Sequence, residues 1–393
     1  MQVFVDKLFF KNERYLRITK ESVSWSDEVQ DNSLFLSLTE KNNFSKLLES
    51  FEIDLPDFFD KPLEKICKTL GVKDPALHRF LSENAYREKF LKLESLIKTL
   101  RKIVFTENYF QKYCEGQEVL EKLEPSWIDK KKLVQYAREE KNPTVKSTLK
   151  SFIPEKSGFC LPPSYDRTKT VTGRLVVSEG PQVLLLPKKY RDVISSNYED
   201  GLVVSIDFVS LEPRFTKLLF CEETKEDIYS DIASSIDLNL SRKEVKLAVL
   251  SILFGAGISK LTEHFDREAM EVKKQVSNYF NLEEVSKIVD SNFRDNSLVN
   301  YFGRPIKVRK SARNVLLNNY IQSSCVDVAL MGFSKLLKEF SNIESLRPLA
   351  VIHDALVVDL KKSKLQELEK IVSNGIKIEN LGKFFLEVES YEK

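Results

Sequence analysis

Two apolar segments that read as buried strands each contain an aspartate, and this combination constrains the fold more than any other feature of the chain. LVVSID ends in Asp207, and VIHDALVVDL, residues 351–360, is interrupted by His353 and Asp354. A buried carboxylate without a partner is costly enough that it normally binds a proton. The simplest interpretation is a tight turn, in which His353 and Asp354 separate two short strands.

A second interpretation brings the two aspartates together. Two carboxylates at close range repel each other unless cations lie between them. Pairs of Mg²⁺ ions about 4 Å apart, held by oxygen ligands, serve phosphoryl transfer in this way. Asp207 and Asp354 are therefore candidate catalytic and metal-binding residues. Mg²⁺ is the expected cofactor, as two ions, and Mn²⁺ is an alternative ion.

A helix with a cationic face is predicted in LSRKEVKLAVLSILFGAG, residues 240–257. Ser241 and Glu244 form the signature of a capping box, so the helix should begin at Arg242. Positions four apart share a face, since each step of four drifts by only about 40°. That face carries Arg242, Lys246, Leu250 and Phe254. The cations lie where the helix dipole favours anions, so the face suits a triphosphate followed by a sugar and base; an ordinary amphipathic helix is the alternative.

Length and composition indicate two or three structural units, or one enzyme built of subdomains around a cleft. The chain has 393 residues, of which 42% are hydrophobic and 31% charged. No apolar run approaches the roughly 18 residues of a membrane helix, so no membrane partner is expected. The start of the chain lacks the pattern of a signal peptide. The net charge of +2 comes from 61 basic and 59 acidic residues, which neither requires nor excludes nucleic acid.

The cysteines show no paired spacing; they are Cys67, Cys114, Cys160, Cys221 and Cys325. Zinc ligands and disulfide frameworks both show regular spacing, so neither is indicated. We expect a reducing, cytoplasmic compartment.

Periodicity along the chain predicts an α+β fold. Strand-like segments open residues 1–80, and residues 84–150 are helical and rich in Lys and Arg. That helical segment is either a solvated amphipathic pair or a basic arm on a phosphate backbone. After residues 151–200, rich in turn residues, strands alternate with long helical insertions, which suggests a sheet with a helical excursion from its middle.

From about residue 145 to its end, the chain resembles the family A (Pol I-like) DNA polymerases, including their phage members. TVTGRL and the following PQVLLLP with Arg191 are similar to one family segment, and SIDFVSLEPRF is similar to motif A. RKEVKLAVLSILFG resembles motif B, and VIHDALVV resembles motif C. NYFGRP and NVLLNNYIQSS resemble the segments that lie between motifs B and C.

The resemblance implies a right-hand polymerase architecture. Residues 81–150 would form a helical thumb, and residues 151–221, with motif A, would begin the palm with its antiparallel sheet. Residues 222–299 would form helical fingers with the motif B helix at 241–256, and 300–393 would complete the palm with motif C. Residues 1–80 would be a small α/β remnant or a docking region for a replication partner.

The resemblance also implies a role for each candidate residue. Asp207 and Asp354 would bind two Mg²⁺ ions, and Arg242 and Lys246 would hold the triphosphate of an incoming dNTP. Glu212 would exclude a ribose 2′-hydroxyl. Contacts to primer and template would come from Arg174, Asn318, Gln322 and His353. Asn318 and Gln322 could instead be solvated, and Arg214 could be a structural ion-pair partner.

Four positions depart from the family pattern. Leu250 stands in place of Phe or Tyr, so discrimination against dideoxynucleotides is not assumed. Phe254 replaces a Tyr, which keeps the ring and loses the hydroxyl. Tyr229 stands where a phosphate-binding His often lies, and it could donate to a phosphate without carrying charge. Ala355 replaces a common Glu of motif C, which predicts weaker metal or primer handling without loss of activity.

We expect a template-directed DNA polymerase for replication or repair, in the cytosol of a bacterium or a phage-infected host. LFLSLTEK is weakly similar to the first acidic motif of proofreading exonucleases, but Ser37 stands where that motif needs an Asp. We therefore expect no 3′ to 5′ editing. The alternatives are a single-subunit phage-type RNA polymerase or primase, which Glu212 argues against, and a catalytically weak DNA-binding accessory protein.

Overall fold

The structure, a computed structural model, describes residues 1–31, 33–72, 75–220, 223–236, 238–308 and 312–391. The chain forms two compact units, residues 1–118 with 302–305 and residues 119–301 with 306–393. The division falls inside helix α5 (Asn108–Glu121), so the predicted thumb segment has residues in both units. Cys221 and the predicted palm–fingers junction at 221–222 lie outside the described residues.

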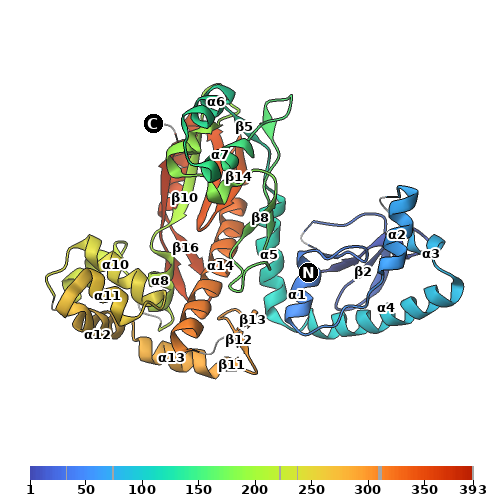
Figure 1. Ribbon diagram of the computed structural model, residues 1–393, viewed down its shortest axis with the longest axis horizontal. Helices are drawn as coiled ribbons and strands as arrows, with labels where there is room; N and C mark the ends of the chain where they lie inside the picture. Colours follow the sequence, from blue (N-terminus) through green and yellow to red (C-terminus); the bar gives the residue numbers. More distant parts are fainter. Residues whose placement is uncertain (32, 73–74, 221–222, 237, 309–311, 392–393) are drawn as a thin grey trace. The chain divides into compact units, whose positions relative to one another are not determined.

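The first unit contains a four-stranded sheet, of which β2 is labelled in Figure 1. The order of its strands is β3-β2-β1-β4. Three strands form an antiparallel meander, and the fourth runs parallel to β1. The strands are β1 (Val3–Val5), β2 (Tyr15–Ile18), β3 (Val23–Ser26) and β4 (Leu34–Leu36). The helices are α1 (Asn43–Ser50), α2 (Lys61–Leu70), α3 (Leu77–Phe80) and α4 (Glu83–Ile103), with η1 (Lys7–Phe9) after β1.

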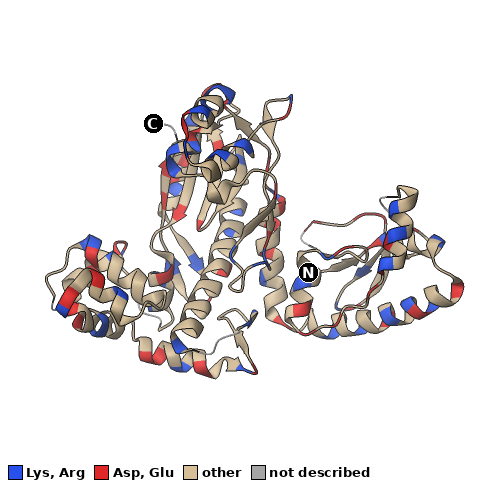
Figure 2. Cartoon of the chain, in the orientation of Figure 1, with Lys and Arg blue, Asp and Glu red and all other residues tan. Residues whose placement is uncertain are grey.

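Helix α4 carries both signs of charge along its length (Figure 2). Two ion pairs span one helical turn each, Lys92 with Glu88 at 2.7 Å and Lys98 with Glu94 at 3.1 Å. Such alternation is typical of a solvated helix. Of the two predicted interpretations, α4 therefore favours the solvated helix over a basic arm.

The second unit is built on an antiparallel sheet in the order β14-β15-β10-β18 (Figure 1). Its strands are β14 (Leu346–Ile352), β15 (Ala355–Lys361), β10 (Gly201–Phe208) and β18 (Leu386–Ser390). Strands β10 and β15 are buried almost throughout, which explains why their sequences are apolar without alternation. The two predicted apolar strands are confirmed, and they pair with each other.

Helix α14 (Arg313–Phe340) packs on this sheet at the end of β10. The rings of Phe208 and Phe333 lie 5.5 Å apart, measured between centroids. Gly332 faces the same Phe208 ring, and a Cβ added at Gly332 would lie only 2.6 Å from it. The close approach of helix and strand therefore requires glycine at this position.

A helical group lies in the sequence between β10 and β14, as predicted for an α+β fold (Figure 1). After α8 (Leu211–Leu218) it comprises α9 (Ile228–Ser235), α10 (Arg242–Leu253), α11 (Ile258–Phe265), η4 (Asp266–Glu268), α12 (Ala269–Tyr279) and α13 (Leu282–Ser291). No described helix of the chain is both long enough and apolar enough to cross a membrane.

Shorter elements complete the chain. The helices are α6 (Lys130–Glu139), α7 (Pro143–Lys150), η2 (Val183–Leu185), η3 (Lys188–Val193), η5 (Lys362–Lys364) and α15 (Leu365–Ser373). The strands are β5 (Ser126–Ile128), β6 (Phe159–Cys160), β7 (Ser164–Asp166), β8 (Val176–Glu179), β9 (Ile194–Ser195), β11 (Phe293–Arg294), β12 (Ser297–Val299), β13 (Pro305–Lys307), β16 (Ile376–Ile378) and β17 (Gly382–Phe384).

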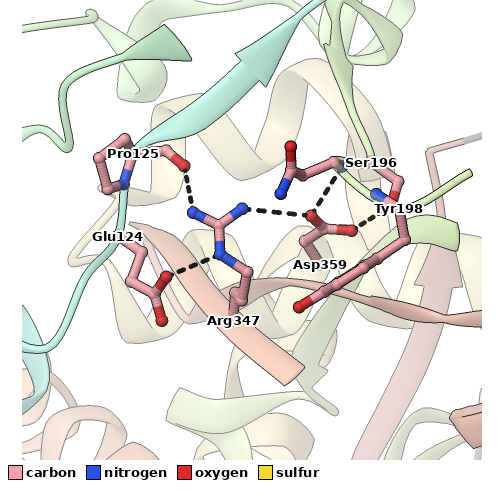
Figure 3. A network of polar contacts seen from close by, with 7 residues as sticks. Glu124, Pro125, Ser196, Tyr198, Arg347 and Asp359 are labelled. Atoms are coloured by element: carbon pink, nitrogen blue, oxygen red, sulfur yellow. Dashed lines mark hydrogen bonds and ion pairs between the residues drawn. The ribbon is translucent and has the colours of Figure 1, made fainter. Parts of the chain in front are cut away.

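An ion-pair network around the buried Asp359 joins β14 and β15 to the segment before β5 (Figure 3). Arg347 donates to Glu124 at 2.7 Å and to the Pro125 carbonyl at 2.9 Å. It also forms an ion pair with Asp359 at 3.6 Å, where the Asp359 side chain is 1% exposed. The Asn197 N–H donates to the same carboxylate at 3.0 Å. These contacts fix the end of the sheet away from Asp207.

Candidate active site

A two-residue loop joins β14 to β15 and presents Asp354. Ile352 pairs with Ala355, so His353 and Asp354 alone turn the chain, and His353 adopts a left-handed φ of 57°. The predicted turn is therefore confirmed. Ala355 also pairs with Asp207 on β10, and the Phe208 N–H donates to the Asp354 carbonyl at 3.1 Å. The register thus brings the two aspartates to the same end of neighbouring strands.

Both aspartates have a raised pKa. Burial is the main cause for Asp207, opposed by a hydrogen bond from the Ser205 hydroxyl at 3.1 Å. The pKa of Asp354 is raised to about 6 by burial first, and then by the negative charges of Glu212 and Asp207. A nearby cation would relieve both the burial cost and the repulsion. The carboxylate oxygens are also the donor type that Mg²⁺ prefers, so the residues present fit the metal.

Over the part of the chain that the structure describes, no three His, Cys, Asp or Glu side chains cluster closely enough to hold an ion. The two aspartates would therefore need further oxygen ligands from waters or a substrate, which is the usual way in which proteins bind Mg²⁺.

A cavity of about 350 Å³ lies beside Asp354. Five of the predicted site residues line it: Arg174, Glu212, Gln322, His353 and Asp354. The rest of its wall is mainly apolar and is formed by Leu175, Leu184, Leu211, Cys325, Val326, Ala329 and Leu330. A mostly apolar cavity with a few converging polar groups is typical of a substrate site.

The predicted motif B helix is α10, which is shorter than the predicted 241–256. It begins at Arg242 behind a complete capping box of Ser241 and Glu244, as expected. It ends at Leu253 because Gly255 adopts a left-handed φ of 77°. The N–H groups of Gly255 and Ala256 donate to the carbonyls of Ile252 and Ser251, which closes the helix as a Schellman motif.

Helix α10 presents its cations beside Tyr229. The Arg242 guanidinium carbon and the Lys246 Nζ each lie 5.7 Å from the centre of the Tyr229 ring. Arg242 also forms an ion pair with Asp227 at 2.7 Å, which holds the pKa of Asp227 well below its ordinary value. Both partners are substantially exposed, so a stronger anion could replace Asp227 at little cost.

Tyr229 is buried, with 3% of its surface exposed, and its hydroxyl bonds to Ser210. The cations therefore meet its ring, whereas the sequence suggested that its hydroxyl would reach a phosphate. Farther along α10, Leu250 is half-buried and Phe254 is 39% exposed. Phe254 caps the helix end and faces Arg174, whose guanidinium carbon lies 6.0 Å from the ring centre.

The remaining predicted contacts lie on α14 and on the hairpin. Gln322 donates to Asn318 at 2.6 Å, so the two amides form a pair, and only Gln322 reaches the cavity. Burial lowers the pKa of His353, and the positive charges of Arg174 and Arg191 lower it further. His353 is therefore neutral at pH 7, and can accept or donate one hydrogen bond without adding charge.

Arg214 has a structural role. It is fully buried, donates to the carbonyls of Val209, Lys225 and Glu226, and lies 4.5 Å above the Phe385 ring. The sequence left open a structural role as an ion-pair partner; the contacts of Arg214 are instead to backbone carbonyls and an aromatic ring.

Two features of the site were missed from the sequence. Cys325, Ala329 and their neighbours continue the Gln322 face of α14, and helical spacing from Gln322 could have identified them. Glu387 of β18 pairs directly with Asp207 on the side opposite Ala355, and its charge contributes to the raised pKa of Asp207. No local pattern reveals that pairing, because the register joins distant segments.

Comparisons with known proteins identify the family and the fold. The family model described as DNA polymerase family A matches residues 89–390. Among solved structures, the chain is similar to the polymerase domain of Pol1 from M. smegmatis, solved with a DNA primer-template and dNTP. The TM-score is 0.54 at 15% sequence identity, over 90% of this chain and 78% of that chain. At this identity the likeness shows the fold alone. A search of curated protein sequences found no match.

The family match spans most of the chain and includes both aspartates, α10 and the cavity. The chain therefore belongs to DNA polymerase family A and is a DNA-directed DNA polymerase.

Proposed function

We propose that this polymerase extends a primer 3′-hydroxyl with dNTPs through two Mg²⁺ ions held by Asp207 and Asp354. The observation that carries the proposal is the strand register, which brings Asp207 and Asp354 to one end of paired strands, together with the cavity that Asp354 lines. When bound, the ions would lower the pKa of the 3′-hydroxyl and neutralise charge on the phosphate oxygens. Mn²⁺ would be an alternative ion.

Arg242 and Lys246 hold the incoming triphosphate. They are exposed on the first turns of α10, where the helix dipole also favours anions. The triphosphate takes the place of Asp227 on Arg242, while the Tyr229 ring keeps both cations in position. Leu250 and Phe254 then provide an apolar platform for the sugar and base, and Glu212 excludes a ribose 2′-hydroxyl.

The primer end and the template contact Arg174, His353, Asn318 and Gln322. His353 is neutral at pH 7 and the amides of Asn318 and Gln322 are uncharged, so these three hydrogen-bond the nucleic acid without strong attraction, whereas Arg174 adds a positive charge. The M. smegmatis Pol1 domain, a similar fold, was solved with a primer-template and dNTP.

The elements take the roles of a right-hand polymerase. The sheet of β14, β15, β10 and β18 with α14 acts as the palm, and the helical group from α9 to α13 acts as the fingers. Residues 81–150 act as the thumb. Residues 1–80 serve as a remnant or a docking region. The polymerase has no 3′ to 5′ editing activity, since Ser37 supplies a hydroxyl where the exonuclease motif needs a metal-binding carboxylate. A test for loss of nucleotides from a labelled 3′ end checks the absence of editing.

We further propose a cytosolic role in replication or repair, in a bacterium or a phage-infected host. The cysteines of the described segments are free and buried, as expected of a protein from a reducing compartment.

Primer extension on a defined template with Mg²⁺ tests the function. We expect the wild type to extend with dNTPs and Asp207→Asn to lose extension. Asp200→Asn is the matched control, because Asp200 is exposed before the other end of β10 and should not affect activity. Preference for rNTPs would instead indicate an RNA polymerase or primase. Tight DNA binding without extension, unchanged by Asp354→Asn, would indicate an accessory protein.

A further inference from the structure

Arg174 and Glu212 line the cavity, and Phe254 from a third segment contacts Arg174. The roles proposed above do not require these side chains to touch. Arg174 Nη2 donates to Glu212 Oε1 at 3.4 Å, and the Arg174 guanidinium carbon lies 6.0 Å from the centre of the Phe254 ring. We refer to Arg174, Glu212 and Phe254 as the Arg174 cluster.

The backbone of Arg174 is held by the preceding turn. The Gly173 N–H donates to the Thr170 carbonyl at 3.1 Å, and Gly173 adopts a φ of 77° that favours glycine. The Thr170 hydroxyl donates in turn to the Arg174 carbonyl at 2.9 Å. Because these bonds fix the Arg174 backbone, the contacts with Glu212 and Phe254 depend on the conformation of the Arg174 side chain, which is half-exposed.

Glu212 stands in the first turn of α8, and its side chain is only 18% exposed. A carboxylate on this flexible side chain can exclude a hydroxyl from the nucleotide sugar only if it keeps its place when the nucleotide arrives. A planar guanidinium is well suited to this purpose, because its donors have a fixed geometry that matches a carboxylate. Arg174 therefore restrains the Glu212 carboxylate at the cavity wall.

Phe254 contacts the Arg174 guanidinium as well. Its ring carries no hydroxyl that could donate to Glu212, and the family resemblance places a Tyr at this position. The ring face attracts the guanidinium through a cation–π contact instead.

We propose that Arg174 is a specificity-determining residue, which selects deoxyribonucleotides over ribonucleotides by positioning the Glu212 carboxylate while its own guanidinium lies over the Phe254 ring. This rests on the proposed function, in which Glu212 excludes the 2′-hydroxyl. The role differs from a primer contact, because losing a primer contact slows dNTP and rNTP addition alike, whereas losing the position of Glu212 changes their ratio.

Single-nucleotide primer extension tests the proposal through the ratio of kcat/KM for a dNTP to that for the matching rNTP. Arg174→Lys keeps the charge and loses the planar fork, and Arg174→Gln loses both. We expect each to lower the ratio by about 10-fold to 100-fold, the range that one hydrogen bond to a charged group supports. Arg174 is half-exposed, so both variants should fold, which a thermal melt checks.

Two further variants separate positioning from a general defect. In Arg174→Lys, adding Phe254→Tyr should recover part of the ratio, because a ring hydroxyl offers Glu212 a new donor. In Glu212→Ala the ratio should fall at least as far, and adding Arg174→Lys should lower it no further, since the two residues act through one contact.

The outcomes are distinct. A wild-type chain that extends no primer overturns the proposed function and this inference with it. A wild type that selects dNTPs, with a ratio unchanged by Arg174→Lys and Arg174→Gln, overturns this inference and leaves the polymerase assignment intact. Independent, additive losses in the Glu212→Ala and Arg174→Lys double variant also overturn it.

Discussion

The two aspartates of the site differ in what surrounds them. Asp207 accepts a hydrogen bond from Ser205 and has Ala355 and Glu387 as its cross-strand neighbours. A carboxylate at position 355 would give Asp207 acidic neighbours on both adjacent strands. Ala355 therefore limits the negative charge around Asp207 at this end of the sheet. Asp354 and Glu212 both line the cavity. The negative charges of Glu212 and Asp207 both raise the pKa of Asp354.

Asp354→Asn should stabilise the metal-free protein while abolishing extension. The folded-state pKa of about 6 lies above the ordinary value of 3.8, so stability from this group is present at low pH and is lost as pH rises through 6. At pH 8 the ionised carboxylate costs about 2 to 3 kcal/mol, at about 1.4 kcal/mol per pKa unit. Urea unfolding in EDTA at pH 8 should show a gain of that size, and near pH 3.5 the gain should almost disappear.

Asp200→Asn serves as the control, since Asp200 is exposed and should show no gain at either pH. A destabilised Asp354→Asn at pH 8 would contradict this account of the site. Added Mg²⁺ should stabilise the wild type and leave Asp354→Asn nearly unaffected.

At the level of elements, the site depends on how α14 and the sheet hold β10 in place. Phe208 follows Asp207 directly and packs against α14 at Gly332 and Phe333. Farther from the site, Arg347 and Asp359 tie β14 to β15 and to the segment before β5. The strand end that carries Asp207 is thus fixed by packing, and the opposite end of the sheet by charge.

Gly332→Ala should displace the Phe208 ring and with it the end of β10. Overpacking of this kind costs about 1 to 3 kcal/mol, and we expect primer extension to slow because Asp207 shifts. Urea unfolding and extension rates measure the two effects. Adding Phe208→Leu makes room for the new methyl group and should recover part of the rate; no recovery would show that the strand end does not depend on this contact.

Arg347→Met should destabilise the second unit by about 3 kcal/mol, because it leaves the Asp359 carboxylate buried without its ion pair. Arg347→Met combined with Asp359→Asn removes the stranded charge and should be more stable than Arg347→Met alone. Chemical unfolding at pH 7 compares the three proteins. Equal loss in the single and double variants would show that packing, and not charge, holds this end of the sheet.

The sequence predicted those parts of the site that depend on neighbouring residues. The start of α10 follows from Ser241 and Glu244, and the hairpin follows from His353 and Asp354 within an apolar run. The contacts between Arg174, Glu212 and Phe254 could not be predicted, since they depend on how three separate segments pack. The pairing of Asp207 with Glu387 likewise depends on strand register, which only the folded sheet defines.

At the level of the whole molecule, the chain divides into two compact units, and the described site lies in the second. Each unit has its own sheet and its own buried apolar residues. Units of this kind unfold separately unless their contacts are extensive, so a single unfolding free energy does not describe such a chain.

Scanning calorimetry of the full chain in EDTA should therefore show two transitions. Asp354→Asn should raise the Tm of one transition and leave the other unchanged, because the substitution lies in the second unit. Mg²⁺ titration of the wild type should move the same transition. One cooperative transition that shifts as a whole would show that the units unfold together.

The order of strands in the second sheet also has a consequence for synthesis of the protein. Strand β10 lies between β15 and β18, both of which the ribosome makes much later. Until residue 361 has emerged, the nascent chain carries β10 with two open edges, and until residue 390 has emerged one of those edges stays open. An apolar strand with an open edge is the kind of segment that aggregates or engages chaperones. Ribosome-bound chains that stop before Leu386 should therefore be captured by chaperones more strongly than chains that extend beyond Ser390.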